Sequence, residues 1–329
     1  MLNRWRDNNG AQLASATRGK SQGATRNCLR QFSADAQSFC AVRRAMTPAI
    51  ARSTGYLVPR EDFSCAVHSV FTTACNLEWE ATLLTVASPA TGNGPTTVVL
   101  SDPSLDLRRL FVRGEIVRFQ RSALRSQRTR VQLAHATTWF PPAQRAVLDA
   151  PHIGANVHRA EQSLLRARAT NASVIDHEAA GVVAALLAAC RSRDSSEACR
   201  LVARLIGWGE GLTPAGDDFL VGWLAALGRL GCCDRDLEFL AAVRRAILAR
   251  IANTTQIAGH FLSLATQGHF VEAILCVLDA LLCQQGREIA ENAVERLLQI
   301  GATSGADLCT GLLGGIAAWM PVESNLTPS

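Results

Sequence analysis

The segment best suited to chemistry is the glycine-rich stretch at residues 207–222, GWGEGLTPAGDDFLVG. Four of its glycines lie within ten consecutive residues: Gly207, Gly209, Gly211 and Gly216. Glycine lets backbone N–H groups converge because no Cβ stands in the way. An apolar helix is expected to begin near Asp217, so the stretch predicts a group of backbone donors at a helix start, which suits phosphate or carboxylate. The hydroxyl of Thr213 would add a further donor.

Two adjacent carboxylates, Asp217 and Asp218, stand at the same helix start. One of them is predicted to cap the helix, because Asp is a favoured capping residue. The other is predicted to hold a cationic or amide N–H group, or a Mg²⁺ ion shared with a phosphate. Asp217, Asp218 and Thr213 are therefore the catalytic candidates. A cofactor is not otherwise implied, and both a metal-free site and a magnesium site remain open.

Two other helix starts resemble the first. Residues 300–308 read IGATSGADL, with the spacing of a capping box from Ser304 to Asp307. Thr254 and Thr255 open another helix, with His260 five residues beyond the second threonine. Capping by Thr and Ser, and a structural histidine, are the alternatives to ligand binding here. We predict that the loops before residues 217 and 304 face each other across one pocket.

Several kinds of site are excluded by the sequence. It has no G-x-S-x-G, H-E-x-x-H or G-x-x-x-x-G-K-[ST] motif. Lys20 is its one lysine, so a Schiff-base lysine in the body of the chain is excluded. The eleven cysteines include no C-x-x-C pair, and a signal peptide is not evident, which favours reduced thiols in the cytoplasm. No apolar run reaches the length of a membrane span.

Positive charge is concentrated at the N-terminus. Residues 1–45 carry eight basic and two acidic residues, whereas the chain as a whole has a net charge of +5. The remaining 284 residues are therefore nearly neutral, which argues against binding of nucleic acid or of an anionic membrane. We expect residues 1–45 to be a disordered extension, either a transit-like segment or an over-extended start with Met46 as the true initiator.

The chain is predicted to be an α+β protein, with a β-rich domain at 46–142 and a helical bundle domain at 143–329. Short segments rich in Val, Thr and Leu predict strands at 81–87, 96–100, 110–119 and 130–139. Apolar residues at helical spacing predict helices at 157–169, 176–191, 197–206, 217–230, 236–252, 255–267, 270–284, 288–299 and 304–319.

Three motifs resemble those of the AllH family. They are GEGLTPAGDDFLVG at 209–222, Thr254-Thr255 with the helix leading to ATQGH at 265–269, and GATSGAD at 301–307. The family is described as a subunit of the oxamate carbamoyltransferase of allantoin degradation, a part of purine catabolism. Ala215 stands where the family's pattern has serine, and Gln256 where it has a basic residue.

The resemblance implies that a carbamoyl group is transferred between oxamate and phosphate: oxalurate and phosphate give oxamate and carbamoyl phosphate. It also implies other subunits as partners, besides the small anions phosphate, carbamoyl phosphate and oxamate. The residues predicted to bind substrate are Gly209, Gly211, Leu212, Gly216, Thr254, Thr255, His260, Thr303, Ser304 and Asp307.

Three hypotheses about the role of the chain follow. In the first, it supplies all or most of a carbamoyl-transfer site, with an arginine such as Arg113 or Arg118 from the β-rich half. In the second, it is a non-catalytic subunit that binds a small anion or holds the assembly together, because the glycine loops lack the Arg or Lys that phosphate chemistry recruits. In the third, it is a helical structural protein without a small-molecule site.

Overall fold

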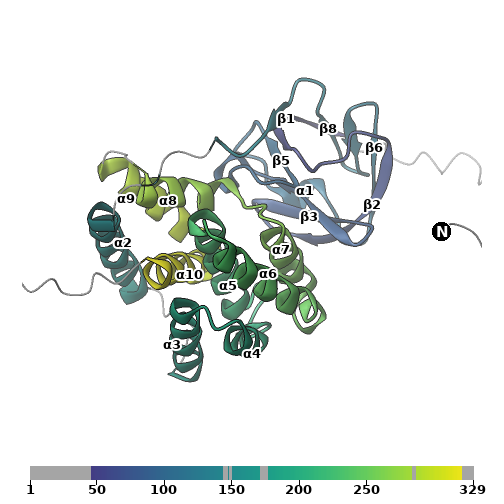
Figure 1. Cartoon of the computed structure of the whole chain (residues 1–329). Coiled ribbons are helices and arrows are strands. Elements are labelled where there is room, and N and C mark those ends of the chain that lie inside the picture. Colours follow the sequence, from purple (N-terminus) through teal and green to yellow (C-terminus); the bar gives the residue numbers. More distant parts are fainter. Residues whose placement is uncertain (1–45, 144–146, 148–149, 171–176, 284–286, 321–329) are drawn as a thin grey trace, which may run out of the picture. The chain divides into compact units, whose positions relative to one another are not determined.

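Strands occupy the first half of the chain and helices the second (Figure 1). The computed structural model describes residues 46–143, 147, 150–170, 177–283 and 287–320. Residues Ala45–Ser329 form one unit, so contacts between the strand and helix regions can be described. The basic extension at 1–45 lies outside the described residues. The α+β prediction agrees with this arrangement, whereas the division at residue 142 into two domains stays a prediction.

The strands of the described residues form one nine-stranded sheet that closes on itself. Their bounds are β1 Thr47–Gly55, β2 Phe63–Val70, β3 Ala74–Trp79, β4 Thr82–Ala87, β5 Thr97–Leu100, β6 Ile116–Gln120, β7 Ala123–Arg125, β8 Thr129–Gln132 and β9 Thr137–Trp139. Their order is β5-β4-β3-β2-β6-β7-β8-β1-β9, and β1 also pairs antiparallel with β5. This second pairing closes the ring, which leaves fewer unpaired strand edges.

Alternating burial along the strands fills the inside of this barrel with apolar side chains. In β6, Val117 and Phe119 are buried while their neighbours are exposed. Leu77, Val86 and Leu100, from β3, β4 and β5, belong to the same cluster and are almost fully buried. The barrel interior is therefore a packed core rather than a channel.

The strand predictions were correct for β4 and β5 and wrong in part elsewhere. Residues 110–119 are not one strand, because Asp106 caps the short helix α1, Leu107–Leu110, and the chain turns before β6. Residues 130–139 are split into β8 and β9, with a turn in which the Ala136 N–H donates to the Leu133 carbonyl. Strands β1, β2, β3 and β7 were not predicted from the sequence.

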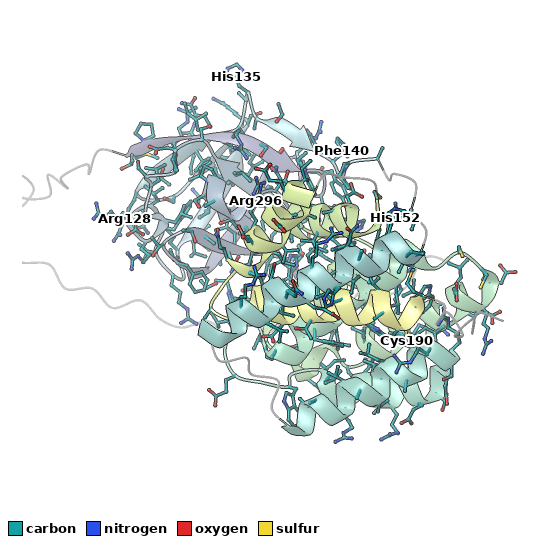
Figure 2. All side chains as sticks on the ribbon, turned by 90° about the vertical axis from the view of Figure 1, so that its left-hand side faces the viewer. Arg128, His135, Phe140, His152, Cys190 and Arg296 are labelled. Atoms are coloured by element: carbon teal, nitrogen blue, oxygen red, sulfur yellow. The ribbon has the colours of Figure 1, made fainter. Side chains whose placement is uncertain are left out.

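The predicted helices are confirmed with end shifts of up to four residues, except that α2 begins seven residues earlier than predicted. Residues 176 and 284, a predicted start and a predicted end, lie outside the described residues. The bounds are α2 Ala150–Thr170, α3 His177–Ser192, α4 Ser195–Leu205, α5 Ala215–Leu230, α6 Asp234–Leu248, α7 Gln256–Thr266, α8 Glu272–Leu282, α9 Arg287–Leu298 and α10 Ser304–Trp319. Single 3-10 turns occupy Pro89–Thr91 and Ile251–Asn253. Figure 2 shows α2 crossing α10, with which it is in contact. No helix in the described residues is both long and apolar enough to cross a bilayer.

Helices α5 and α10 lie at the centre of the helical region and touch backbone to backbone. Every residue of α5 from Ala215 to Leu227 is buried. A Cβ at Gly222 would lie 2.1 Å from the Leu308 carbonyl oxygen, and one at Gly311 would lie 2.0 Å from the Phe219 oxygen. Glycine at these positions therefore allows the close approach, which brings the first turns of the two helices together.

Candidate functional site

The loop before α5 needs its glycines for backbone conformation and for packing. Gly207, Gly209 and Gly211 have φ angles of 75°, 108° and 93°, in the region that favours glycine. Inside the helix, a Cβ at Gly216 would lie 2.1 Å from the carbonyl oxygen of Leu205. These requirements account for the glycine density without a bound ligand.

Backbone donors at this helix start are used within the chain. The Gly216 N–H donates to the Trp208 carbonyl at 2.9 Å, and the N–H groups of Asp217 and Asp218 donate to the Pro214 carbonyl at 3.0 and 3.1 Å. The predicted group of anion-binding amides is therefore wrong for these three N–H groups. The reason is that the loop folds back on the helix and supplies its own acceptors.

The capping prediction for the two aspartates is also wrong. The residue at the N-cap position of α5 is Pro214, which makes no side-chain cap. Asp217 and Asp218 both lie in the first turn, where a carboxylate still interacts favourably with the helix dipole.

Asp217 has its hydrogen bonds satisfied by the chain. Its side chain is buried, and its Oδ1 accepts the Gly207 N–H at 3.0 Å. Its Oδ2 accepts the hydroxyl of Thr254. Burial raises the pKa of this carboxyl, while the two hydrogen bonds lower it. Asp217 thus ties the glycine loop and the turn before α7 to the start of α5.

Asp218 is buried too, but its contacts are different. Its side chain hydrogen-bonds with the hydroxyls of Ser304 and Thr213, and its Oδ2 has no partner among the described residues. Burial raises its pKa to about 8, and the charges of Asp307 and Asp217 add to the rise. The carboxyl is therefore mostly protonated at pH 7, so it can both donate and accept a hydrogen bond.

The second loop meets the first, as the sequence led us to expect. The Oγ1 of Thr213 and the Oγ of Ser304 are 2.8 Å apart. The predicted capping box is wrong, because Thr303 takes the N-cap position without a side-chain cap and Ser304 is the first residue of α10. Asp307 is fully buried and lies close enough to Asp218 to raise its pKa.

A cavity of about 310 Å³ opens beside these groups. We call it the Asp218 cavity, and its polar lining residues are Asn76, Thr91, Thr213, Asp218, His269 and Ser304. Apolar side chains such as Leu212, Phe261 and Ile300 form most of the remaining wall. Within the described part of the chain, no lysine or arginine lines it. The Asp218 cavity therefore suits a small, uncharged polar group better than a bare anion.

His269 brings a second titratable group to the Asp218 cavity. Its Nδ1 is 2.7 Å from the hydroxyl of Tyr56, and the two rings meet edge to face. Burial lowers the pKa of this histidine from its ordinary value. A neutral imidazole held by Tyr56 can accept a proton or a hydrogen bond from a ligand.

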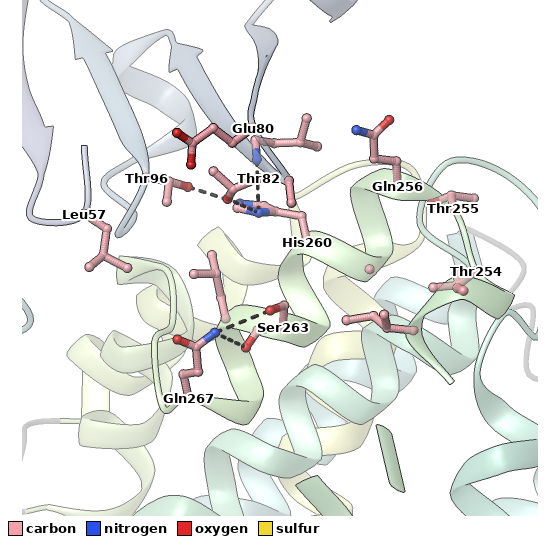
Figure 3. A pocket seen from close by; sticks show the side chains of 16 residues that line it. Leu57, Glu80, Thr82, Thr96, Thr254, Thr255, Gln256, His260, Ser263 and Gln267 are labelled. Carbon is pink, nitrogen blue, oxygen red and sulfur yellow. Dashed lines mark hydrogen bonds between the residues drawn. The ribbon is translucent and has the colours of Figure 1, made fainter. Parts of the chain in front are cut away.

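Other predicted residues line a different cavity, of about 600 Å³, which includes Thr254, Thr255 and His260 (Figure 3). His260 points from α7 toward the barrel, where its Nδ1 is 3.1 Å from the Thr82 hydroxyl and its Nε2 is 3.2 Å from the Thr96 hydroxyl. Burial lowers the pKa of His260 to about 4, so the ring is neutral at pH 7. This histidine joins the helices to the barrel.

Thr255 is the helix cap that the sequence offered as an alternative. Its hydroxyl accepts the Ala258 N–H at 3.1 Å and donates to the Leu212 carbonyl. Gln256, where the family has a basic residue, donates to the carboxylate of Glu78 at 2.8 Å. That position therefore faces the barrel rather than the Asp218 cavity.

The structure thus divides the predicted site residues into three sets. Four of them line the Asp218 cavity: Leu212, Thr213, Asp218 and Ser304. Three line the 600 Å³ cavity of Figure 3, which we call the His260 cavity: Thr254, Thr255 and His260. Six line neither: Gly209, Gly211, Gly216, Asp217, Thr303 and Asp307. Their roles in binding or catalysis stay predictions.

Two residues of the Asp218 cavity were missed as site candidates. His269 ends the motif ATQGH, and the glycine before it, with a φ of 82°, lets the chain turn back toward the cavity. Asn76 lies on β3, and no sequence signal connects this strand with the helix starts. Among the described residues, no group of three or more His, Cys, Asp or Glu is placed to hold a metal ion.

Two family models match the chain. Residues 205–316 match the model described as oxamate carbamoyltransferase subunit AllH, and residues 43–138 match the AllH family N-terminal domain. The chain belongs to the AllH family. No solved structure matches it.

The AllH match confirms the resemblance found in the sequence. Its residues 205–316 contain both helix starts, Asp218 and His269. The AllH N-terminal match, residues 43–138, covers the barrel up to the start of β9 and includes Asn76 on β3 and Phe71 just after β2, which both line the same cavity. The Asp218 cavity is thus built from both matched segments.

Proposed function

We propose that this chain is a subunit of an oxamate carbamoyltransferase, and that the Asp218 cavity is where the carbamoyl group is transferred between oxamate and phosphate. The family description supports the subunit role. The observation that carries the site is the buried Asp218 carboxyl, mostly protonated at pH 7, whose Oδ2 has no partner among the described residues.

A neutral carboxyl is complementary to a carboxamide. Its O–H donates to the amide carbonyl, and its second oxygen accepts an amide N–H, so the two groups pair through two hydrogen bonds. Oxamate and the carbamoyl group both present such an amide. The hydroxyls of Thr213 and Ser304, 2.8 Å apart, hold the carboxyl and can turn toward the ligand.

The same group suits proton transfer. When phosphate oxygen attacks the terminal carbonyl carbon of oxalurate, the carbon–nitrogen bond breaks and the departing oxamate nitrogen needs a proton. Asp218 gives that proton, and the proton that the attacking hydrogen phosphate loses restores the acid. Atoms and charge balance, and the products are oxamate and carbamoyl phosphate. A general acid with a pKa near the working pH is the most effective for such a step.

Ligand binding to the full-length chain is the first test. Thermal unfolding would be followed with oxamate and with oxalate, which has the same size but carries a carboxylate in place of the amide. Oxamate should raise the melting temperature more than oxalate, because only oxamate offers the N–H that the Asp218 carboxyl accepts. Equal shifts with the two ligands would contradict the pairing.

A turnover assay distinguishes a catalytic subunit from the alternative, a non-catalytic subunit that binds an anion or holds the assembly together. That alternative is favoured by the lack of Arg and Lys in the described lining of the Asp218 cavity. Formation of carbamoyl phosphate from oxalurate and phosphate would be measured with the chain alone and with its partner subunits. Asp218→Asn should lower turnover by at least about 10²-fold. Asp234→Asn, on the exposed first turn of α6, should leave it unchanged. Unchanged turnover in the assembled Asp218→Asn variant would favour the alternative.

A further inference from the structure

A second cavity, of about 470 Å³, adjoins the Asp218 cavity and carries the positive charge that the first one lacks. Its lining includes Arg108, Arg113, Arg128 and His68, and no described lining residue is Asp or Glu. We call it the arginine cavity. It shares Phe71 and Leu212 with the Asp218 cavity, so the two cavities adjoin at these side chains.

We propose that the arginine cavity binds the oxyanion of the substrate, the phosphate of carbamoyl phosphate or free phosphate, while the Asp218 cavity holds the carbamoyl end. This inference rests on the proposed function, because that function requires both an amide and a phosphate on the same chain or assembly. Guanidinium groups match the oxygens of phosphate in geometry and charge.

Arg113 and Arg128 are the ligands in this proposal. Within the described residues, neither guanidinium has an ion pair or a hydrogen bond with another side chain. Arg108, in contrast, is already paired with Asp106, its Nη2 lying 2.7 Å from Oδ2. Arg128 is partly buried and lies at the edge of the β region in Figure 2. Arg113 and Arg128 thus line the same cavity without a side-chain partner in the described structure. A bound anion would reduce the repulsion between their positive charges.

A buried carboxylate holds the two arginine-bearing turns together. Glu115 is 7% exposed, and its Oε1 accepts the Val112 N–H at 2.7 Å while its Oε2 accepts the Gln127 N–H at 3.2 Å. Val112 precedes Arg113 and Gln127 precedes Arg128. Because one carboxylate binds the backbone beside both arginines, it holds the two arginine-bearing turns next to each other.

The second turn is fixed further by Ser126. Its Oγ accepts the Arg128 N–H at 3.1 Å and donates to the Leu110 carbonyl at 3.0 Å. A backbone fixed in this way reduces the conformational entropy lost when an anion is bound.

A chain of hydrogen bonds also runs from one cavity to the other. In the arginine cavity, the Nδ1 of His68 is 3.1 Å from the Ser69 hydroxyl. The Nδ2 of Asn76, which lines the Asp218 cavity, donates to the same hydroxyl at 3.0 Å. Hydrogen-bonded polar side chains therefore line the boundary between the arginine cavity and the Asp218 cavity. This arrangement suits a substrate that has an anionic end and an amide end.

The test measures phosphate binding to the full-length chain by calorimetry, with inorganic phosphate as the probe. Arg113→Gln and Arg128→Gln should each weaken binding at least about tenfold, since a hydrogen bond to a charged group contributes about 1.5–3 kcal/mol. Arg130→Gln is the matched control, because Arg130 is exposed on β8 and does not line the arginine cavity. A parallel titration with oxamate distinguishes a phosphate site from a general carboxylate site.

The outcomes separate this inference from the proposed function. Loss of phosphate binding in both variants, with binding kept in Arg130→Gln and Asp218→Asn, supports it. Unchanged phosphate binding in both variants overturns it, even if Asp218→Asn abolishes turnover and the proposed function stands. An equal loss in Arg130→Gln also overturns it, because the effect would then be one of overall charge. Loss of oxamate binding without loss of phosphate binding overturns it as well.

Discussion

Asp217 and Asp218 are neighbours in the first turn of α5, but their side chains lie in different surroundings. On the inner side, both oxygens of Asp217 are occupied by Gly207 and Thr254. On the cavity side, Asp218 meets two hydroxyls and keeps one oxygen without a partner in the described structure. The two neighbouring aspartates thus have different roles: Asp217 fixes the glycine loop, whereas Asp218 faces a cavity that a ligand can occupy.

This difference shows how a fold can use a buried carboxyl for chemistry. A buried carboxyl whose oxygens are all hydrogen-bonded has little to offer a ligand, whereas an incompletely paired one tends to keep its proton. The rise in the pKa of Asp218 to about 8 follows from burial, and its two hydroxyl partners do not cancel that rise. The two aspartates should therefore differ in their effects on rate, on stability and on the dependence of stability on pH.

The largest effect is expected from Asp218→Asn on the rate of carbamoyl transfer. The amide has the same shape and can still hydrogen-bond to Thr213 and Ser304, but it cannot give up a proton. We expect kcat of the assembled enzyme to fall about 10²- to 10⁴-fold, as is usual when a general acid is removed. At pH 7 the variant should also be more stable than the wild type, because the unfolded wild-type chain loses the Asp218 proton whereas the folded chain keeps it.

Steady-state rates with saturating oxalurate and phosphate measure this effect, and Asp234→Asn is the control. A kcat within twofold of the wild type, in a variant that folds normally, would show that Asp218 is not the proton donor.

Asp217→Ala should show the opposite pattern, with its main effect on folding. The substitution leaves the Gly207 N–H and the Thr254 hydroxyl without their acceptor in a buried place. We expect the free energy of unfolding to fall by about 3 kcal/mol, the sum expected for two buried hydrogen bonds to a carboxyl group. Urea denaturation followed by circular dichroism measures it.

Asp217→Asn serves as the milder comparison, since an amide oxygen can still accept one of the two bonds. Should Asp217→Ala unfold at the same urea concentration as the wild type, the carboxyl is not the tie between loop and helix that its contacts indicate.

The sequence was sufficient for the helices because each has a clear apolar period and most of them end near Gly or Pro. Helix α10 begins and ends at the predicted residues. Strands were harder, since β7 spans only Ala123–Arg125 and β1 pairs with three different strands along its length. Such short or shared strands carry too few residues for alternation to be recognised.

The candidate site could be predicted only as far as its loops. Residue types indicated that Asp217 and Asp218 matter, but not which of them faces a cavity. That distinction depends on partners such as Gly207 and Thr254, ten and 37 positions away from Asp217. The N–H groups of Gly207 and Gly216 were misread as anion donors for the same reason, because their acceptors on Asp217 and Trp208 lie in neighbouring turns that the sequence does not reveal.

Packing between α5 and α10 offers a third test of the difference between Asp217 and Asp218. Gly311→Ala would place a Cβ 2.0 Å from the carbonyl oxygen of Phe219, the residue after Asp218. The helices must move apart, which should cost about 2 kcal/mol of stability. Because Ser304 is on α10 and Asp217 is bonded elsewhere, the hydrogen bonds of Asp218 should be disturbed more than those of Asp217. The rate should therefore fall even under conditions where the variant is fully folded.

Gly181→Ala is the control for helix propensity. Nothing lies within 4 Å of a Cβ at Gly181 on α3, so this substitution should raise stability by up to about 1 kcal/mol. If Gly311→Ala were stabilising too, the close contact of the two helices would not be the feature that positions Asp218.

The effect most specific to Asp218 is the dependence of stability on pH. The ordinary pKa of this carboxyl is 3.8 and the folded one is about 8, so between these values the folded protein keeps a proton that the unfolded chain has lost. The free energy of unfolding therefore decreases as pH rises through this window, by at most about 1.4 kcal/mol per pH unit, and levels off above the folded pKa.

His260 acts in the opposite direction, because its pKa is lowered from 6.5 to about 4 and stability is lost as pH falls between these values. Urea midpoints should therefore be compared between pH 7 and pH 8, where His260 is mainly neutral in both states and the contribution of Asp218 remains. The wild type should lose stability relative to Asp218→Asn as pH rises across this range. Parallel curves for the two proteins would mean that the Asp218 carboxyl is already ionised in the folded state, and it could then neither donate to an amide carbonyl nor protonate a departing nitrogen.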